Sequence, residues 1–211
     1  MTEEFLAQEL DRIITIALKE DVGDGDHSSR SCIPPQAQGK AQLLVKDEGV
    51  IAGIAFAKAV FKKVDPSIQF EQLLNDGDTV SYGDVAFYVS GSSLSILTAE
   101  RLALNGMQRM SAIATKTRAF VDKLEGTGTK ILDTRKTTPG IRALEKWAVR
   151  IGGGVNHRFG LYDMIMIKDN HIDFAGGVGA AIQKTKDYLK SNNLELKIIV
   201  EARDLNEIQR V

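Results

Sequence analysis

Apolar segments followed by charged residues recur three times in the second half of the chain. They are KILDTRKT at 130–137, YDMIMIKDNH at 162–171 and LKIIVEARD at 196–204. Helical patterns separate them, GIRALEKWAVRI and GVGAAIQKTKDYL, and Pro139 suits the first turn of the earlier helix. A strand–helix alternation with a spacing of some 32 to 34 residues predicts right-handed βαβ units and a parallel sheet. Asp204 and Glu207 then resemble the capping box of a further helix.

The first half of the chain has a different pattern. Residues 3–19 carry apolar side chains at helical spacing, which predicts an amphipathic helix. A polar connecting turn is expected at EDVGDGDHSSR. Residues 39–98 are mostly short β-branched runs bounded by glycines, with a helix at about 54–63.

A long helix is predicted over residues 97–124. Its apolar face is expected to include Met107, Met110 and Phe120. We expect the domain boundary near the start of this helix, so that residues 1–105 form one domain and residues 106–211 the other.

Charged and polar residues follow each of the three predicted strands. They are Asp133, Arg135 and Lys136 after the first, Lys168, Asp169, Asn170 and His171 after the second, and Glu201 and Arg203 after the third. The loop GGGVNHRFG adds His157 and Arg158 just before the second strand. Ligands bind at the C-terminal edge of parallel strands in α/β sheets and barrels.

If these strands are neighbours, Arg135, Lys136, Arg158 and Lys168 converge on one mouth. Four cations with one carboxylate describe a pocket for a polyanion, and a divalent metal is compatible with it. The alternative for any single residue is a solvated strand end, since most charged side chains lie on the surface.

Other catalytic motifs are missing from the sequence. GGGVNHRFG lacks the third glycine of a dinucleotide fingerprint, and no phosphate-binding GK[ST] loop occurs. His27, His157 and His171 do not have zinc-ligand spacing, and His171 is expected to be a hydrogen-bonding residue. Ser111 and Cys32 have no partner signals for nucleophilic catalysis.

The composition excludes several classes of protein. The net charge is −1, whereas a sequence-independent hold on nucleic acid needs a cationic excess. One cysteine, Cys32, cannot form an internal disulfide and suits a reducing compartment. The start MTEEFLAQEL has no signal-peptide pattern, and no apolar run approaches the ~20 residues of a membrane helix. We therefore expect a cytoplasmic protein that binds neither nucleic acid nor membrane.

Three segments closely resemble signature segments of the quinolinate phosphoribosyltransferase family, also called nicotinate-nucleotide pyrophosphorylase (carboxylating). They are EDVGDGDHSS, ERLALNGMQRMSAIAT and DTRKTTPGIRALEKWAVRIGGGVNHRFGLYDMIMIKDNHI. The similarity runs from about residue 10 to the end and includes GVIAG and DGDTV. Ala112 departs from it, because the family usually has glycine there.

The resemblance implies a fold and a reaction. The fold is an N-terminal α/β sandwich domain followed by an open α/β barrel of parallel strands, in a homodimer whose N-terminal domains cover the partner's barrel mouth. The reaction converts quinolinate and phosphoribosyl pyrophosphate to nicotinate mononucleotide, pyrophosphate and carbon dioxide, with Mg²⁺, in NAD biosynthesis.

The resemblance also assigns roles to individual residues. The substrate-binding cations it implies are Arg135, Lys136, His157, Arg158 and Lys168, with Arg101 reaching across the dimer interface to quinolinate. Glu201 matches an acidic residue near the magnesium-bound ribose, and Lys136 and Glu201 are the residues expected to take part in catalysis.

Residues 125–211 supply only about three strand–helix units, whereas a whole barrel needs roughly 200 residues or more. We therefore expect a barrel that is truncated at its C-terminal side. Two other functions stay open: a phosphoribosyltransferase of the same fold acting on nicotinate or another base, and a non-catalytic fragment that binds anions.

Overall fold

The computed structural model describes residues 2–211 and confirms the α/β class. The chain splits into two compact units, a first unit that ends at His157 and a second unit, Arg158–Val211. The predicted boundary between residues 105 and 106 falls inside a long helix and stays a prediction.

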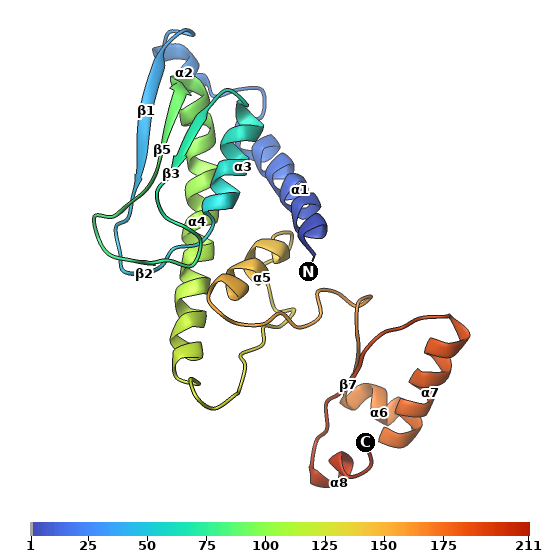
Figure 1. Ribbon diagram of the computed structural model, residues 1–211. Coiled ribbons are helices and arrows are strands. Elements are labelled where there is room, and N and C mark those ends of the chain that lie inside the picture. Colours follow the sequence, from blue (N-terminus) through green and yellow to red (C-terminus); the bar gives the residue numbers. More distant parts are fainter. Residues whose placement is uncertain (1) are drawn as a thin grey trace. The chain divides into compact units, whose positions relative to one another are not determined.

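The first unit contains five helices and five strands among its described residues (Figure 1). In chain order these are α1 (Glu3–Val22), α2 (His27–Cys32), β1 (Gln38–Leu44), β2 (Gly49–Val50), α3 (Ile54–Val64), β3 (Gln69–Gln72), β4 (Thr79–Val80), β5 (Val85–Ser92), α4 (Ser93–Asp122) and α5 (Arg142–Ile151). The predicted helices at 3–19, 54–63 and 97–124 are thus confirmed as α1, α3 and α4. The predicted turn after α1 contains the short helix α2, because the Asp26 carboxylate accepts the backbone N–H of Ser29 and caps it.

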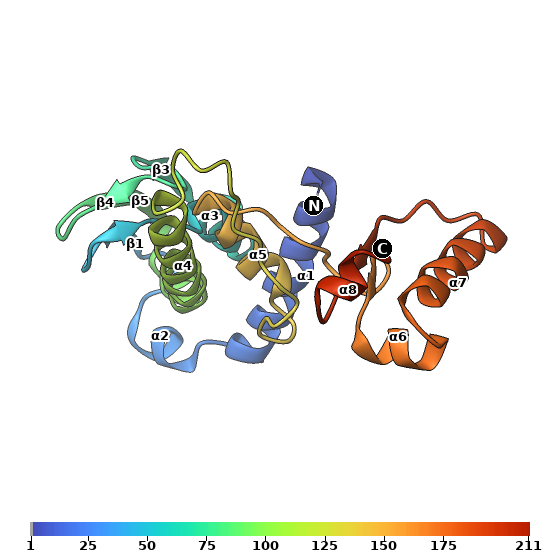
Figure 2. The same ribbon diagram turned by 90° about the horizontal axis from the view of Figure 1, so that it is seen from below.

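A three-stranded antiparallel sheet, in the order β1–β5–β3, forms one layer of the first unit. Helices α3 and α4 cover one face of this sheet, and α1 and α5 lie beyond them (Figure 2). Phe61 of α3 packs against Phe70 of β3 and Phe87 of β5, with ring centroids 6.2 and 6.3 Å away. Burial of these aromatic rings joins the helix layer to the sheet.

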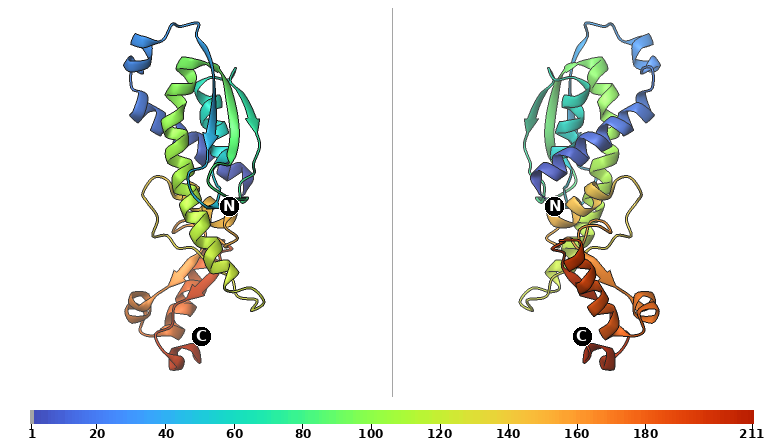
Figure 3. Two further views of the ribbon diagram at one scale, coloured as in Figure 1. Left: turned by 90° about the vertical axis from the view of Figure 1, so that its left-hand side faces the viewer. Right: turned by 90° about the vertical axis from the view of Figure 1, so that its right-hand side faces the viewer.

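Helix α4 has 30 residues and is therefore about 45 Å long. It runs beside β1 and β5 and continues past them to contact α5 (Figure 3). Its close approach to α3 requires Gly106, because a Cβ there would lie 2.1 Å from a ring carbon of the fully buried Phe56. Met107 and Met110 are buried as predicted, whereas Phe120 is 49% exposed and its predicted core position is wrong.

Two hydroxyl groups one turn apart on α4 hold strand β2 and the segment that follows it. Ser111 Oγ accepts from the N–H of Ala52 at 2.9 Å and donates to its carbonyl at 3.1 Å. Thr115 Oγ1 makes the same pair of bonds with Val50, at 2.8 and 3.3 Å. Strand β2 pairs with β4 on its other side, so the helix satisfies an edge that would otherwise be open.

The second unit contains β6 (Ile165–Ile167), α6 (Asp169–Ala175), α7 (Val178–Ser191), β7 (Ile198–Val200) and α8 (Leu205–Ile208). Strands β6 and β7 are parallel neighbours, which confirms the predicted βαβ arrangement for this pair. The core of the second unit consists of Ile167, Ile172, Val178 and Ala181. The described residues do not form a closed barrel, in agreement with the incomplete barrel that was expected.

Two details of the segment 130–141 differ from the sequence prediction. The strand predicted at 130–134 is reduced to one parallel bridge between Leu132 and Val155. Its partner segment follows a run of three glycines and offers only one residue for pairing. Pro139 lies in a turn, and α5 begins only at Arg142, because Gly140 has φ +85°, which a right-handed helix does not allow.

No helix among residues 2–211 is long and apolar enough to cross a membrane.

Candidate functional site

The bridge between Leu132 and Val155 brings two distant parts of the sequence together. The N–H of Val155 donates to the carbonyl of Ile131 at 2.8 Å, and the N–H of Asp133 donates to the carbonyl of Val155 at 3.2 Å. As a result, the chain leading to His157 runs alongside the chain leading to Arg135.

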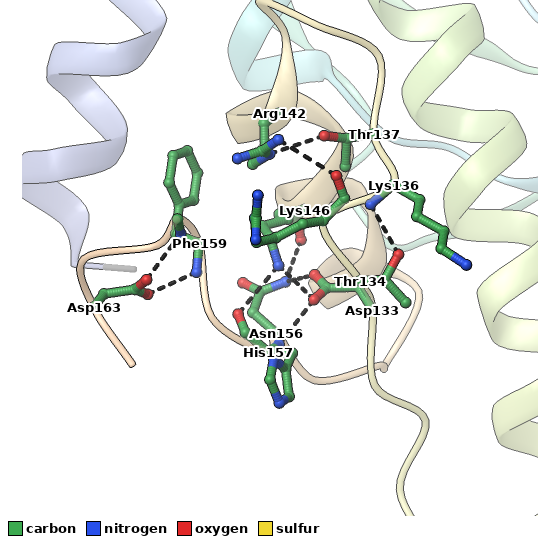
Figure 4. A network of polar contacts seen from close by, with 12 residues as sticks. Asp133, Thr134, Lys136, Thr137, Arg142, Lys146, Asn156, His157, Phe159 and Asp163 are labelled. Atoms are coloured by element: carbon green, nitrogen blue, oxygen red, sulfur yellow. Dashed lines mark hydrogen bonds and ion pairs between the residues drawn. The ribbon is translucent and has the colours of Figure 1, made fainter. Parts of the chain in front are cut away.

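Asp133 is the centre of a buried polar network (Figure 4). Its carboxylate forms an ion pair with Lys146 Nζ at 2.5 Å and accepts the Nδ2 amide of Asn156 at 2.7 Å and the backbone N–H of His157 at 2.8 Å. The side chains of Lys146 and Asp133 are only 1% and 7% exposed. Lys146 Nζ also donates to the His157 carbonyl at 3.1 Å, so both polar groups of the His157 backbone are held.

Arg142, on the first turn of α5, holds the loop that carries Arg135 and Lys136. Its guanidinium donates to Thr137 Oγ1 at 2.9 Å and to the carbonyl of Arg135 at 3.3 Å. The N–H of Lys136 bonds to Thr134 Oγ1 at 3.0 Å. The backbone of this loop is therefore fixed by side chains of its own neighbourhood.

Glu145 anchors the same loop to α4. It accepts the N–H of Thr138 at 3.1 Å and two bonds from the guanidinium of Arg109, at 2.7 and 2.9 Å. Burial disfavours the charge of Glu145, but hydrogen bonds from Arg109 and Thr138 outweigh burial and keep the pKa of this carboxyl below its ordinary value.

The predicted substrate-binding side chains of the first unit differ in exposure. Arg101, on α4, and Lys136 are exposed, and Lys136 extends away from Asp133 (Figure 4). Arg135 and His157 are half-buried. The Nε atom of Arg135 is buried and has no hydrogen-bond partner among the described residues. Such a donor is costly to leave unpaired, and an anionic ligand would satisfy it.

In the second unit, Lys168 and Glu201 follow the neighbouring strands β6 and β7. Lys168 Nζ lies 2.8 Å from Glu201 Oε2, and the N–H of Glu201 donates to the carbonyl of Ile167 at 2.9 Å. The predicted meeting of charged residues at parallel strand ends is thus present for this pair. Both side chains remain substantially exposed, 43% for Lys168 and 60% for Glu201, and are accessible to a ligand.

The other polar residues near these strand ends make contacts within the second unit. Arg158 is buried and donates to the carbonyl of Met164 at 3.3 Å. Arg203 forms ion pairs with Glu207 at 2.6 Å and with Asp173 at 2.8 Å, which raise the pKa of its guanidinium. His171 Nδ1 accepts the N–H of Lys168 at 2.9 Å, as expected of a hydrogen-bonding histidine.

The described residues contain no group of three or more His, Cys, Asp or Glu side chains that could hold a metal ion. A Mg²⁺ ion bound mainly through substrate phosphates needs only one or two protein carboxylates. Glu201 fits that requirement as a single ligand, and its carboxylate is exposed.

The predicted site residues fall in both units. Arg101, Arg135, Lys136 and His157 belong to the first, and Arg158, Lys168 and Glu201 to the second. Their convergence on one mouth remains a prediction. The sequence analysis does not identify Lys146 or Asn156 as part of the site. A lysine between Leu144 and Ala148, on a helix with a strongly apolar side, is a pattern that could have identified Lys146.

These features define an α/β protein with cationic and acidic side chains at the ends of parallel strands. Family models match nearly the whole chain: the N-terminal domain of quinolinate phosphoribosyl transferase over residues 26–111, and its C-terminal domain over residues 113–211. The chain belongs to the quinolinate phosphoribosyltransferase family.

Individual relatives support the same family. Quinolinate phosphoribosyltransferase [decarboxylating] 1b of Nicotiana tabacum is 48% identical over 204 residues, which are 96% of this chain and 58% of the relative. The chloroplastic nicotinate-nucleotide pyrophosphorylase [carboxylating] of Arabidopsis thaliana is 47% identical over 96% of this chain and 58% of the relative. The chain thus spans less than two thirds of the length of these relatives.

Two solved structures are similar. NadC from Streptococcus pyogenes is 40% identical, with a TM-score of 0.88 over 94% of this chain and 69% of that chain. The nicotinate-nucleotide pyrophosphorylase from Francisella tularensis is 37% identical, with a TM-score of 0.86 over 96% and 70%.

Proposed function

We propose that the protein is a decarboxylating quinolinate phosphoribosyltransferase of NAD biosynthesis. It would convert quinolinate and phosphoribosyl pyrophosphate to nicotinate mononucleotide, pyrophosphate and carbon dioxide. The observation that carries the proposal is the buried Nε of Arg135, which has no hydrogen-bond partner among the described residues, in a loop whose backbone is held by the side chains of Arg142, Thr134 and Glu145. The names of the relatives support the same reaction.

Quinolinate carries two adjacent carboxylates, and cations suit both of them. We assign Arg135, His157 and Arg158 to quinolinate, because guanidinium groups bind carboxylates through two parallel hydrogen bonds and an imidazole N–H can donate one more. Arg101 is assigned to quinolinate bound by a second copy of the chain, in a homodimer. Its exposure on α4 leaves it available for that contact.

Lys136 and Lys168 are assigned to the phosphoribosyl pyrophosphate side of the site or to the carboxylates. Lys136 is exposed, the side chain of Lys168 is 43% exposed, and ammonium groups act as point charges toward phosphate. The chemistry supplied by a bound Mg²⁺ is neutralisation of the pyrophosphate leaving group, and Glu201 is its proposed protein ligand.

The chemical step needs positioning and electrostatic stabilisation more than acid–base catalysis. Attack of the quinolinate nitrogen on the ribose carbon breaks the bond from that carbon to pyrophosphate and passes through an oxocarbenium-like state, which the Glu201 carboxylate can stabilise. The ribosylated ring nitrogen is then a cationic electron sink. The bond between the ring and the neighbouring carboxylate breaks, carbon dioxide leaves, and the ring carbon takes a proton from water. The cations hold the two substrates in the geometry that this sequence of events requires.

The cellular location is proposed to be the cytoplasm. Curated relatives of Nicotiana and Arabidopsis include proteins whose names place them in mitochondria or chloroplasts, so fractionation of the native cells is the direct test.

Product analysis separates this function from its alternatives. The purified protein is incubated with phosphoribosyl pyrophosphate, Mg²⁺ and either quinolinate or nicotinate, and nicotinate mononucleotide is measured by chromatography. Product from quinolinate but not from nicotinate supports the proposal. Product from nicotinate would indicate a related phosphoribosyltransferase, and quinolinate binding without product would indicate an anion-binding protein.

A further inference from the structure

Lys146 is a buried lysine that the proposed reaction does not use. Its side chain is 1% exposed on α5, and its Nζ contacts Asp133 Oδ1 at 2.5 Å and the carbonyl of His157 at 3.1 Å. Removing a lysine and a carboxylate from water is costly, and an apolar pair of the same volume is often equally stable or more stable. Stability alone therefore does not account for a lysine at this position.

The contacts of this ion pair join two segments that carry proposed substrate-binding residues. Asp133 lies two residues before Arg135. On the other segment, the His157 N–H donates to Asp133, and its carbonyl accepts from Lys146 (Figure 4). Asn156 adds a link from its Nδ2 to the second oxygen of Asp133, at 2.7 Å.

We propose that Lys146 and Asp133 are positioning residues that hold the Arg135 segment and the His157 backbone in the arrangement that binds quinolinate. The inference rests on the proposed function for the identity of the ligand. Neither side chain has to touch the substrate, since both act through the backbone of the residues that do. Because the pair links segments 24 residues apart, its loss lets them move relative to each other.

The test uses variants that remove the charges together. Lys146→Met alone leaves the buried Asp133 carboxylate without its cation, and this variant could fail to fold. The double variant Lys146→Met/Asp133→Asn is neutral and nearly isosteric, and the side-chain amide that replaces the carboxylate can still accept one hydrogen bond. Quinolinate affinity is measured by titration calorimetry without phosphoribosyl pyrophosphate, and the thermal midpoint is measured on the same samples.

Two controls separate positioning from general loss of stability. Lys63→Met removes an exposed ion pair with Asp11, 2.6 Å long, in the same unit. Asp76→Ala removes the carboxylate that accepts three N–H groups at the start of α3, so it lowers stability elsewhere in that unit. Both controls should bind quinolinate as the unsubstituted protein does.

We expect the double variant to remain folded and to bind quinolinate at least tenfold more weakly, while Asp76→Ala binds normally despite its lower thermal midpoint. Unchanged affinity in the double variant would overturn the inference, and so would an equal loss of affinity in Asp76→Ala. If the unsubstituted protein binds quinolinate but releases no product, the proposed function is overturned. The inference about Lys146 and Asp133 is then still decided by the quinolinate affinities of the variants.

Discussion

Lys168 Nζ lies 2.8 Å from Glu201 Oε2, so the residues that follow two adjacent parallel strands form an ion pair. Both side chains are exposed, and an exposed ion pair stabilises a protein by about 1 kcal/mol at most. The pair is therefore a small part of the stability of the second unit, and a substrate anion can separate it at little cost.

Substitution of Lys168 should separate activity from stability. For Lys168→Met we expect kcat/KM for quinolinate to fall by about 100-fold, the loss typical when one electrostatic contact to the reacting groups is removed. The free energy of unfolding should change by less than about 1 kcal/mol. Steady-state kinetics and urea unfolding measure the two effects. Lys186→Met, at an exposed position of α7, is the matched control, and activity losses of equal size in both variants would contradict the assignment.

Asp76 is predicted to be a main stabiliser of the first unit. Its Oδ1 accepts from Gly53 and Ile54, at 2.5 and 2.8 Å, and its Oδ2 accepts from Ala55 at 3.2 Å. Loss of a helix cap costs about 1–2 kcal/mol, so Asp76→Ala should lower the free energy of unfolding by about that amount. Asp76→Asn keeps one acceptor and should lose less. Equal losses in the two variants, measured by urea unfolding, would argue against the capping role.

Glu145 gives a pH dependence of stability with a definite sign. Its pKa is lower in the folded protein than its ordinary value of 4.5, because bonds from Arg109 and Thr138 outweigh burial. The stabilisation by this carboxylate is therefore complete above about pH 4.5 and is lost as the pH falls through the folded-state pKa.

Glu145→Gln should consequently cost about 1–2 kcal/mol at pH 7 and progressively less below pH 4.5. Urea unfolding of both proteins, at pH values from 7 down to below 4.5, measures the difference in the free energy of unfolding. A cost that stays constant or grows on acidification would contradict the assignment. Glu195→Gln, at an exposed position, is the control and should stay within about 0.5 kcal/mol throughout.

A shared active site can be tested by mixing two inactive variants. Arg101→Ala and Arg135→Ala should each be nearly inactive alone. If Arg101 serves the partner's site, a mixed dimer has one complete site, so random exchange should restore about a quarter of the parent activity. Mixing under conditions that prevent subunit exchange is the control. Absence of recovery after demonstrated exchange would place Arg101 and Arg135 in the same copy or remove Arg101 from the site.

Local patterns explain which parts of the fold the sequence predicts. Helices α3 and α7 and strands β6 and β7 follow from apolar spacing, which is a property of neighbouring residues. The strand expected at 130–134 is wrong because pairing depends on a partner, and Val155 pairs with it only at Leu132. Phe120 is exposed because it lies to one side of the buried stripe of α4, which continues through Ala114 and Thr117.

The candidate site is predictable to a similar degree. The meeting of Lys168 and Glu201 follows from parallel strand ends, which lie at one edge of a sheet. The contacts of Lys146 with Asp133 and His157 do not follow from any local pattern. They depend on the path of the loops between these residues, which tertiary packing decides.

The most direct test of the proposed function is release of labelled carbon dioxide from carboxyl-labelled quinolinate by the purified protein. We predict release that requires phosphoribosyl pyrophosphate and Mg²⁺ together, and a fall of about 100-fold or more for Arg135→Ala. Absence of release from folded protein, or normal release by folded Arg135→Ala, would contradict the account.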